Sequence, residues 1–159
     1  SLWSLYEVVE FSLFEIGYDY VFITSLKKLH EMKIKNSPIC NYCASTDDIC
    51  HFFVHCQDVK LFWEALFDWF NSLQQTEFHF PGDNIILFGY PMDGDLYQVI
   101  NYFILQAKVY IHKQRLFKNN ELSMSEFKRI LKYSLEIERI CCQGKSGNFD
   151  KFEFAYSEL

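Results

Sequence analysis

Hydrophobic residues recur along this chain mainly three or four positions apart, as in helices, rather than at alternate positions, as in strands. The clearest case is segment 95–117, in which Leu96 and Phe103 lie on one predicted face. The same spacing predicts further helices over residues 2–16, 18–32, 57–73 and 124–142. Residues 74–94 hold two turn clusters with Pro and Gly around the apolar run 85–88, which predicts a connector with one small strand.

The last predicted helix begins with a capping pattern. Ser123 precedes Glu126 by three positions, a spacing at which each side chain can accept the other residue's backbone N–H. The composition, with 50% hydrophobic residues, 19% aromatic residues, 6 Gly and 3 Pro, favours long elements over many short strands. We therefore predict a mostly α fold, an irregular helical domain with at most one or two short strands.

The length of 159 residues fits a single domain that spans residues 1–159 and buries a sizeable core. Three parts are expected within it. They are an N-terminal helical segment (1–35), a cysteine-rich segment with the start of the next helix (36–63), and a C-terminal helical pair (95–142).

Charge is distributed unevenly along the chain. The formal net charge of −6 argues against a protein that coats nucleic acid by charge alone. Residues 1–100 carry 5 Lys and Arg against 14 Asp and Glu, whereas residues 101–159 carry 10 against 7. Any phosphate-facing surface is therefore expected in the second half, although basic residues are also the ordinary solvated face of amphipathic helices. The candidates are Lys108, Lys113, Arg115, Lys118, Lys128, Arg129 and Lys132.

The segment 40–56 holds four of the six cysteines and two of the five histidines. Its spacing, C-x2-C-x7-H-x4-C, supplies four soft or borderline ligands of the kind that close a tetrahedral zinc shell. The two-residue gap of the first pair suits the tight turn that adjacent thiolate ligands need. The sequence therefore predicts a structural zinc site with no open position. Its ligands would be Cys40, Cys43, His51 and Cys56.

Two neighbouring residues compete for the last two ligand positions. Cys50 could replace His51, and His55 could replace Cys56. The favoured pair leaves Phe52 and Phe53 free to enter the core. Because positions five apart on an ideal helix point about 140° from each other, the pair also requires a short helix from about residue 48 that breaks near Cys56.

Other functional classes find little support in the sequence. No nucleophile-elbow serine, phosphate-binding glycine loop or His-Glu-x-x-His pattern occurs, so we expect neither a catalytic site nor a small-molecule substrate. No apolar run approaches the ~18–20 residues of a membrane span, and no secretory signal opens the chain. We expect no membrane partner, and a reducing compartment inside the cell, the nucleus or the cytoplasm.

The residues around the cysteine cluster resemble a known family. Ser37-Pro38 precedes the first cysteine, an aromatic pair follows His51, and the pair Phe62-Trp63 follows the last cysteine. This arrangement is similar to the zinc-binding region that follows the reverse transcriptase in LINE-type (non-LTR) retrotransposon polyproteins. The resemblance covers about residues 26–156 and is most specific over 36–63, whereas residues 1–25 depart from it.

The resemblance implies a non-catalytic accessory domain with a zinc knuckle. Polymerase motifs are absent from the chain, so it would bind or position RNA or DNA next to the upstream reverse transcriptase region of the intact polyprotein. The alternative is a structural or protein-interaction module that zinc holds together and that has no nucleic-acid partner. The net charge of −6 favours this alternative.

Overall fold

The computed structural model describes residues 25–115 and 121–141 of the chain. The helices predicted over 2–16 and at the start of 18–32 lie outside this part, as does Lys118. In chain order the described elements are α2 (Leu26–Glu31), the π-helical turn η1 (His51–His55), α3 (Gln57–Gln74), α4 (Asp83–Phe88), α5 (Asp95–Lys113) and α6 (Met124–Cys141). The bridge Ile39–Thr46 is the one extended pairing among the described residues. The prediction of a mostly α, irregular helical domain is therefore confirmed.

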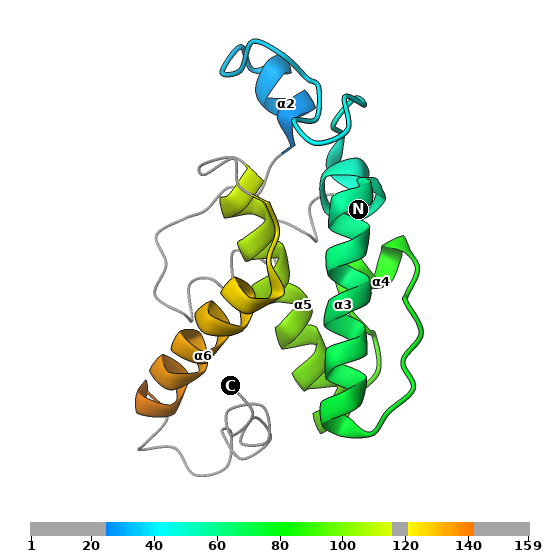
Figure 1. Cartoon of the computed structure of the whole chain (residues 1–159), viewed down its shortest axis with the longest axis vertical. Helices are drawn as coiled ribbons and strands as arrows, with labels where there is room; N and C mark the ends of the chain where they lie inside the picture. The colour runs from blue at the N-terminus through cyan, green and yellow to red at the C-terminus, as the bar shows by residue number, and fades with distance from the viewer. Residues whose placement is uncertain (1–24, 116–120, 142–159) are drawn as a thin grey trace.

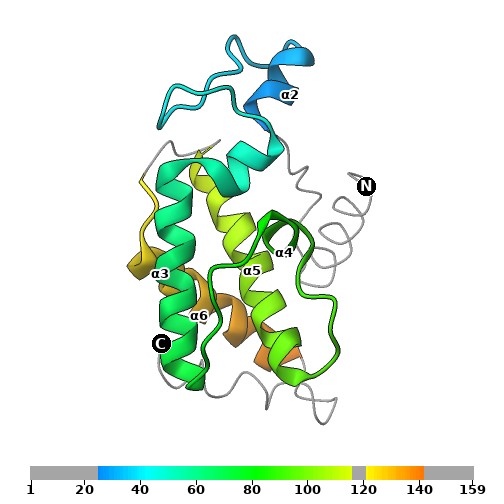
Figure 2. The ribbon, with the colours of Figure 1, turned by 90° about the vertical axis from the view of Figure 1, so that its right-hand side faces the viewer.

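The two longest helices form the body of the described structure. Helices α3 and α5 run side by side, and α6 crosses them obliquely (Figures 1 and 2). Helix α2 and the loop that follows it stand at one end of this body, at the top of both views. The cysteine-rich segment therefore lies where the chain passes from α2 into α3.

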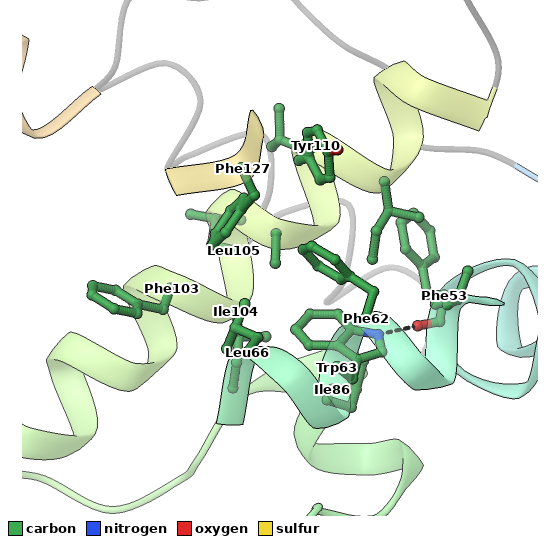
Figure 3. Close-up of a cluster of buried hydrophobic side chains, with 14 of the residues drawn as sticks. Phe53, Phe62, Trp63, Leu66, Ile86, Phe103, Ile104, Leu105, Tyr110 and Phe127 are labelled. Atoms are coloured by element: carbon green, nitrogen blue, oxygen red, sulfur yellow. Dashed lines mark hydrogen bonds between the residues drawn. The ribbon is translucent and has the colours of Figure 1, made fainter. Parts of the chain in front are cut away.

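Aromatic rings fill the core between these helices (Figure 3). Phe62 of α3 meets Phe127 of α6 edge to face, with ring centroids 5.4 Å apart, and both rings are buried. The indole Nε1–H of Trp63 donates to the backbone carbonyl of Phe53 at 2.7 Å. Burial of one such side chain contributes about 2–3 kcal/mol, so these rings anchor η1 and α6 firmly to α3.

The predicted small strand at 85–88 is wrong, because this run forms part of α4. A short apolar run looks the same in a buried strand and in a buried helical turn, and spacing alone does not separate them. Asp83 in the first turn favours the helix start, and Gly89 ends the helix with a φ of 81°. Asn101 of α5 then fixes the following residue, because its side chain bonds both the N–H and the C=O of Tyr90, at 2.7 and 3.0 Å.

Of the two hydrogen bonds that the capping pattern before α6 predicts, the structure forms one. The backbone N–H of Glu126 donates to Ser123 Oγ at 3.4 Å, as expected. The N–H of Ser123 instead donates to the hydroxyl oxygen of Tyr110, at 2.9 Å. The start of α6 is thus tied to α5 by a buried tyrosine, a tertiary contact that local spacing does not reveal.

Candidate metal centre

The structure brings the four predicted ligands together. The ligand atoms of Cys40, Cys43, His51 and Cys56 all lie within 4.8 Å of one another. Cys40 Sγ and Cys56 Sγ are 3.8 Å apart. Two thiolates bound tetrahedrally at ~2.3 Å from one zinc ion would be about 3.8 Å apart, so this pair already has the required spacing. Cys43 Sγ and His51 Nε2, at 3.1 Å, would have to separate by a few tenths of an ångström to admit an ion.

A tight hairpin over residues 38–47, which we call the knuckle hairpin, presents the first two cysteines. Its backbone is closed by the bond from Cys40 N–H to the Ser45 carbonyl at 2.8 Å and by the bond from Asp47 N–H to the Pro38 carbonyl at 2.9 Å. The chain reverses at Ala44, which has a φ of 59°. The N–H of Tyr42 points at Cys40 Sγ, 3.4 Å away, a contact that favours a thiolate at this position.

A π-helical turn brings the other two ligands to the same side. The N–H of Cys56 donates to the carbonyl of His51 at 3.1 Å, a bond between residues five apart. An ideal α-helix would separate these side chains by about 140°, but a π turn, with about 4.4 residues per turn, reduces the difference to about 50°. The helix then ends, because Cys56 has a ψ of 131°. The predicted short helix that breaks near Cys56 is confirmed, and its widened turn explains the spacing.

The two competing residues lie outside the cluster. The group of ligand atoms that the structure brings together contains neither Cys50 nor His55. His55 is exposed and pairs instead with Asp83 of α4, with Nε2 and Oδ2 2.6 Å apart. Phe52 and Phe53 are fully buried, as the favoured ligand pair requires.

Burial shifts the pKa of two ligands. It lowers the pKa of the His51 imidazole, and the Asp47 carboxylate opposes this shift only in part, so the ring is neutral at pH 7 and suited to bind a metal. Burial also raises the pKa of the Cys56 thiol to about 12. A metal ion must displace this tightly held proton, so its affinity falls as the pH falls.

A buried arginine two residues beyond the C-terminal end of α5 contacts the cluster. Arg115 Nη2 donates to Cys40 Sγ at 2.9 Å and to Asp47 Oδ1 at 3.0 Å. Its Nη1 donates to the carbonyl of Phe52. The guanidinium also lies over the ring of Phe52, 4.2 Å from its centroid. Sequence reasoning missed this role, because nothing local to the cysteine segment points to a residue 75 positions away.

Two of the seven predicted nucleic-acid residues are buried, which is a correction. Arg115 is enclosed at the cluster, and the Lys108 side chain turns inward, where Nζ donates to the carbonyl of Leu87 at 2.9 Å. Lys108 lies within residues 103–112 of α5, which are buried on every face, and Arg115 follows shortly after the end of this helix. Apolar residues that recur on one face of a helix predict that the opposite face is solvated, but α5 has no solvated face here.

The other candidates differ in exposure. Lys113 is half-buried, and Lys128 places Nζ 4.7 Å from the centroid of the Trp69 ring. Arg129 and Lys132 are exposed on α6. A second group of exposed cations, which we call the knuckle lysines, lies on and just after α2; sequence reasoning overlooked it, although four lysines in nine residues are a visible signal. The knuckle lysines are Lys27, Lys28, Lys33 and Lys35.

Comparison of the chain with protein-family models, with curated proteins and with solved structures gave no match. Within the described residues, no helix combines the length and apolar character that crossing a bilayer requires. A function for this chain must therefore be argued from its own side chains.

Proposed function

We propose that this chain is a non-catalytic domain in which one structural zinc ion fixes the cysteine-rich segment onto a helical core. The observation that carries this proposal is the convergence of four ligand atoms within 4.8 Å. Four protein ligands complete a tetrahedral shell and leave no position for a substrate or an activated water. This closed arrangement is typical of a site that stabilises a fold rather than one that catalyses a reaction.

The ligand set favours zinc over other biological metals. Three thiolates and one imidazole are soft or borderline donors, which suit zinc and disfavour magnesium or calcium. Cys40, Cys43, Cys50 and Cys56 are free thiols. Because thiolate ligands persist in a reducing compartment, we place the domain in the nucleus or the cytoplasm.

The zinc assignment can be tested by single substitutions at matched positions. Wild-type protein should bind one equivalent of zinc, and Cys56→Ser should lose it, because the remaining three ligands leave the shell open. Cys50→Ser and His55→Ala, which alter a cysteine and a histidine outside the cluster, should keep one equivalent. Metal content after gel filtration measures this directly. Equal zinc content in Cys56→Ser and Cys50→Ser would contradict the ligand set.

A second candidate role is the positioning of RNA or DNA as an accessory domain of a LINE-type reverse transcriptase. The resemblance around residues 36–63 motivates it, and the knuckle lysines support it. Helix α2 lies against the knuckle hairpin, because the N–H of Lys27 donates to the carbonyl of Asp47 at 3.1 Å. The knuckle lysines therefore lie on a segment that contacts the knuckle hairpin, at the end of the described structure where α2 stands (Figure 1). Phosphate binding would be centred there rather than on the helices of segment 95–142.

This role can be tested with two charge reversals of equal size. Changing all four knuckle lysines to Glu should weaken binding to single-stranded RNA at least tenfold and reduce the salt slope by about 3, because about 0.7 counterions are released per phosphate contact. The matched control reverses four exposed cations on α3 and α6, namely Lys60, Arg129, Lys132 and Arg139. A larger loss of RNA affinity in the control would place the RNA-binding surface on the helices instead. Equal affinity of all three proteins would leave the structural module without a nucleic-acid partner.

A further inference from the structure

Arg115 connects the knuckle hairpin to the helical core, two parts of the chain that are distant in sequence. The knuckle hairpin is mostly exposed: of its ten residues, Cys40 and Asp47 are buried. Both of these residues accept a hydrogen bond from the same nitrogen of Arg115. The arginine itself lies two residues after the end of α5, the most buried helix described. Both buried side chains of the hairpin therefore bond one guanidinium, while Cys40 and Tyr42 also pack against the core.

The positive charge of this guanidinium faces two negative groups of a loaded site, the zinc–thiolate cluster and the Asp47 carboxylate. Three thiolates and a neutral imidazole on Zn²⁺ carry a net charge of −1. A buried anion of this kind is costly unless a cation and hydrogen-bond donors accompany it. Arg115 provides both, and its planar fork reaches Cys40, Asp47 and the Phe52 carbonyl together. Its stacking on Phe52 holds the fork in this orientation.

We infer that Arg115 is an outer-sphere positioning residue that couples metal binding to the docking of the knuckle hairpin on α5. This inference rests on the proposed zinc site and deepens it. With zinc bound, Cys40 Sγ is a thiolate, and charge-assisted hydrogen bonds are roughly twice as strong as neutral ones. The contact is therefore stronger in the loaded state than in the empty one. Such a coupling is reciprocal: Arg115 tightens zinc binding by the same factor by which zinc stabilises the docked hairpin.

The test measures zinc affinity by competition with a chromophoric chelator, using the whole chain. Arg115→Met keeps the length and apolar stem but removes charge and donors, and should bind zinc about 10–100-fold more weakly, the usual cost of losing an outer-sphere partner. Arg115→Lys keeps the charge but not the planar guanidinium, so its zinc affinity should lie between those of wild type and Arg115→Met. The matched control is Lys108→Met, the same change at the other buried cation of this segment, and it should bind zinc as wild type does.

A second variant separates coupling from folding. Arg115→Met leaves the Asp47 carboxylate buried without its arginine, so the double variant Arg115→Met with Asp47→Asn removes both charges. It should fold, bind zinc about 10–100-fold more weakly, and show a smaller rise of the unfolding midpoint on adding zinc than wild type. Zinc affinity within threefold of wild type in both variants would overturn the inference. So would failure of both to fold at saturating zinc, because Arg115 would then serve the core without regard to metal. Failure of wild type to bind zinc would instead refute the proposed function.

Discussion

A chelator that removes the proposed zinc ion should unfold the knuckle hairpin while the helical core stays folded. The hairpin has two buried residues, and its two ligand bonds to zinc, from Cys40 and Cys43, would tie it to His51 and Cys56. The core of α3, α5 and α6 is instead held by buried rings such as Phe62 and Phe127. Hydrogen exchange with and without a chelator should show amide protection at Cys40 and Asp47 falling by at least about 1000-fold. Helix content should change little.

The turn η1 sets the boundary of this local unfolding. Phe52 and Phe53 are fully buried, and Trp63 bonds the carbonyl of Phe53, so residues 52–56 should keep their protection. Cys56→Ser should reproduce the pattern of the chelated protein, and Cys50→Ser should behave as wild type. Loss of helix content together with the hairpin would contradict the expectation, since the core would then depend on metal as much as the hairpin does.

Replacing Lys108 by Met should stabilise the protein at pH 7. The ammonium is buried and donates to one backbone carbonyl, and burial lowers the pKa of Lys108 to about 8. Relative to an unfolded pKa near 10.4, this shift corresponds to about 3 kcal/mol against the folded state at neutral pH. Loss of the bond to the Leu87 carbonyl offsets about 1–2 kcal/mol of the gain. Urea unfolding should therefore give a net increase of about 1–2 kcal/mol.

The pH dependence of this difference identifies its origin. Below pH 8 the lysine is protonated in both states, and the full penalty applies. Between pH 8 and about 10.4 the unfolded state binds more protons than the folded state, so wild-type stability should rise relative to Lys108→Met by about 3 kcal/mol. The control Lys60→Met, at an exposed position on α3, should show no such slope. A constant difference between wild type and Lys108→Met from pH 7 to 10.5 would mean that the ammonium is hydrated.

The features predicted correctly are those whose cause is local. The two-residue gap between Cys40 and Cys43 suits a tight turn, and the hairpin contains one. Helices α3, α5 and α6 follow from apolar spacing that continues over 18 or 19 residues. Helix α4 has six residues, too few for spacing to separate a helix from a strand.

The features missed depend on contacts between distant segments. Whether Lys108 and Arg115 face solvent is decided by what packs against the far side of α5, and the pattern within one helix carries no information about that. The same holds for Tyr110, which accepts the N–H that the spacing assigned to Glu126. Polar residues on a strongly apolar helix are therefore poor evidence of a solvated face when the helix is central.

The π-helical turn also bears on how such sites are recognised by their spacing. On an ordinary α-helix, ligands four positions apart point about 40° from each other, close to the ~50° reached here by ligands five positions apart. One inserted residue, absorbed as a widened turn, thus leaves the coordination geometry nearly unchanged. The spacings His-x3-Cys and His-x4-Cys can therefore present their ligands in nearly the same geometry. A search restricted to either spacing would overlook chains that carry the other.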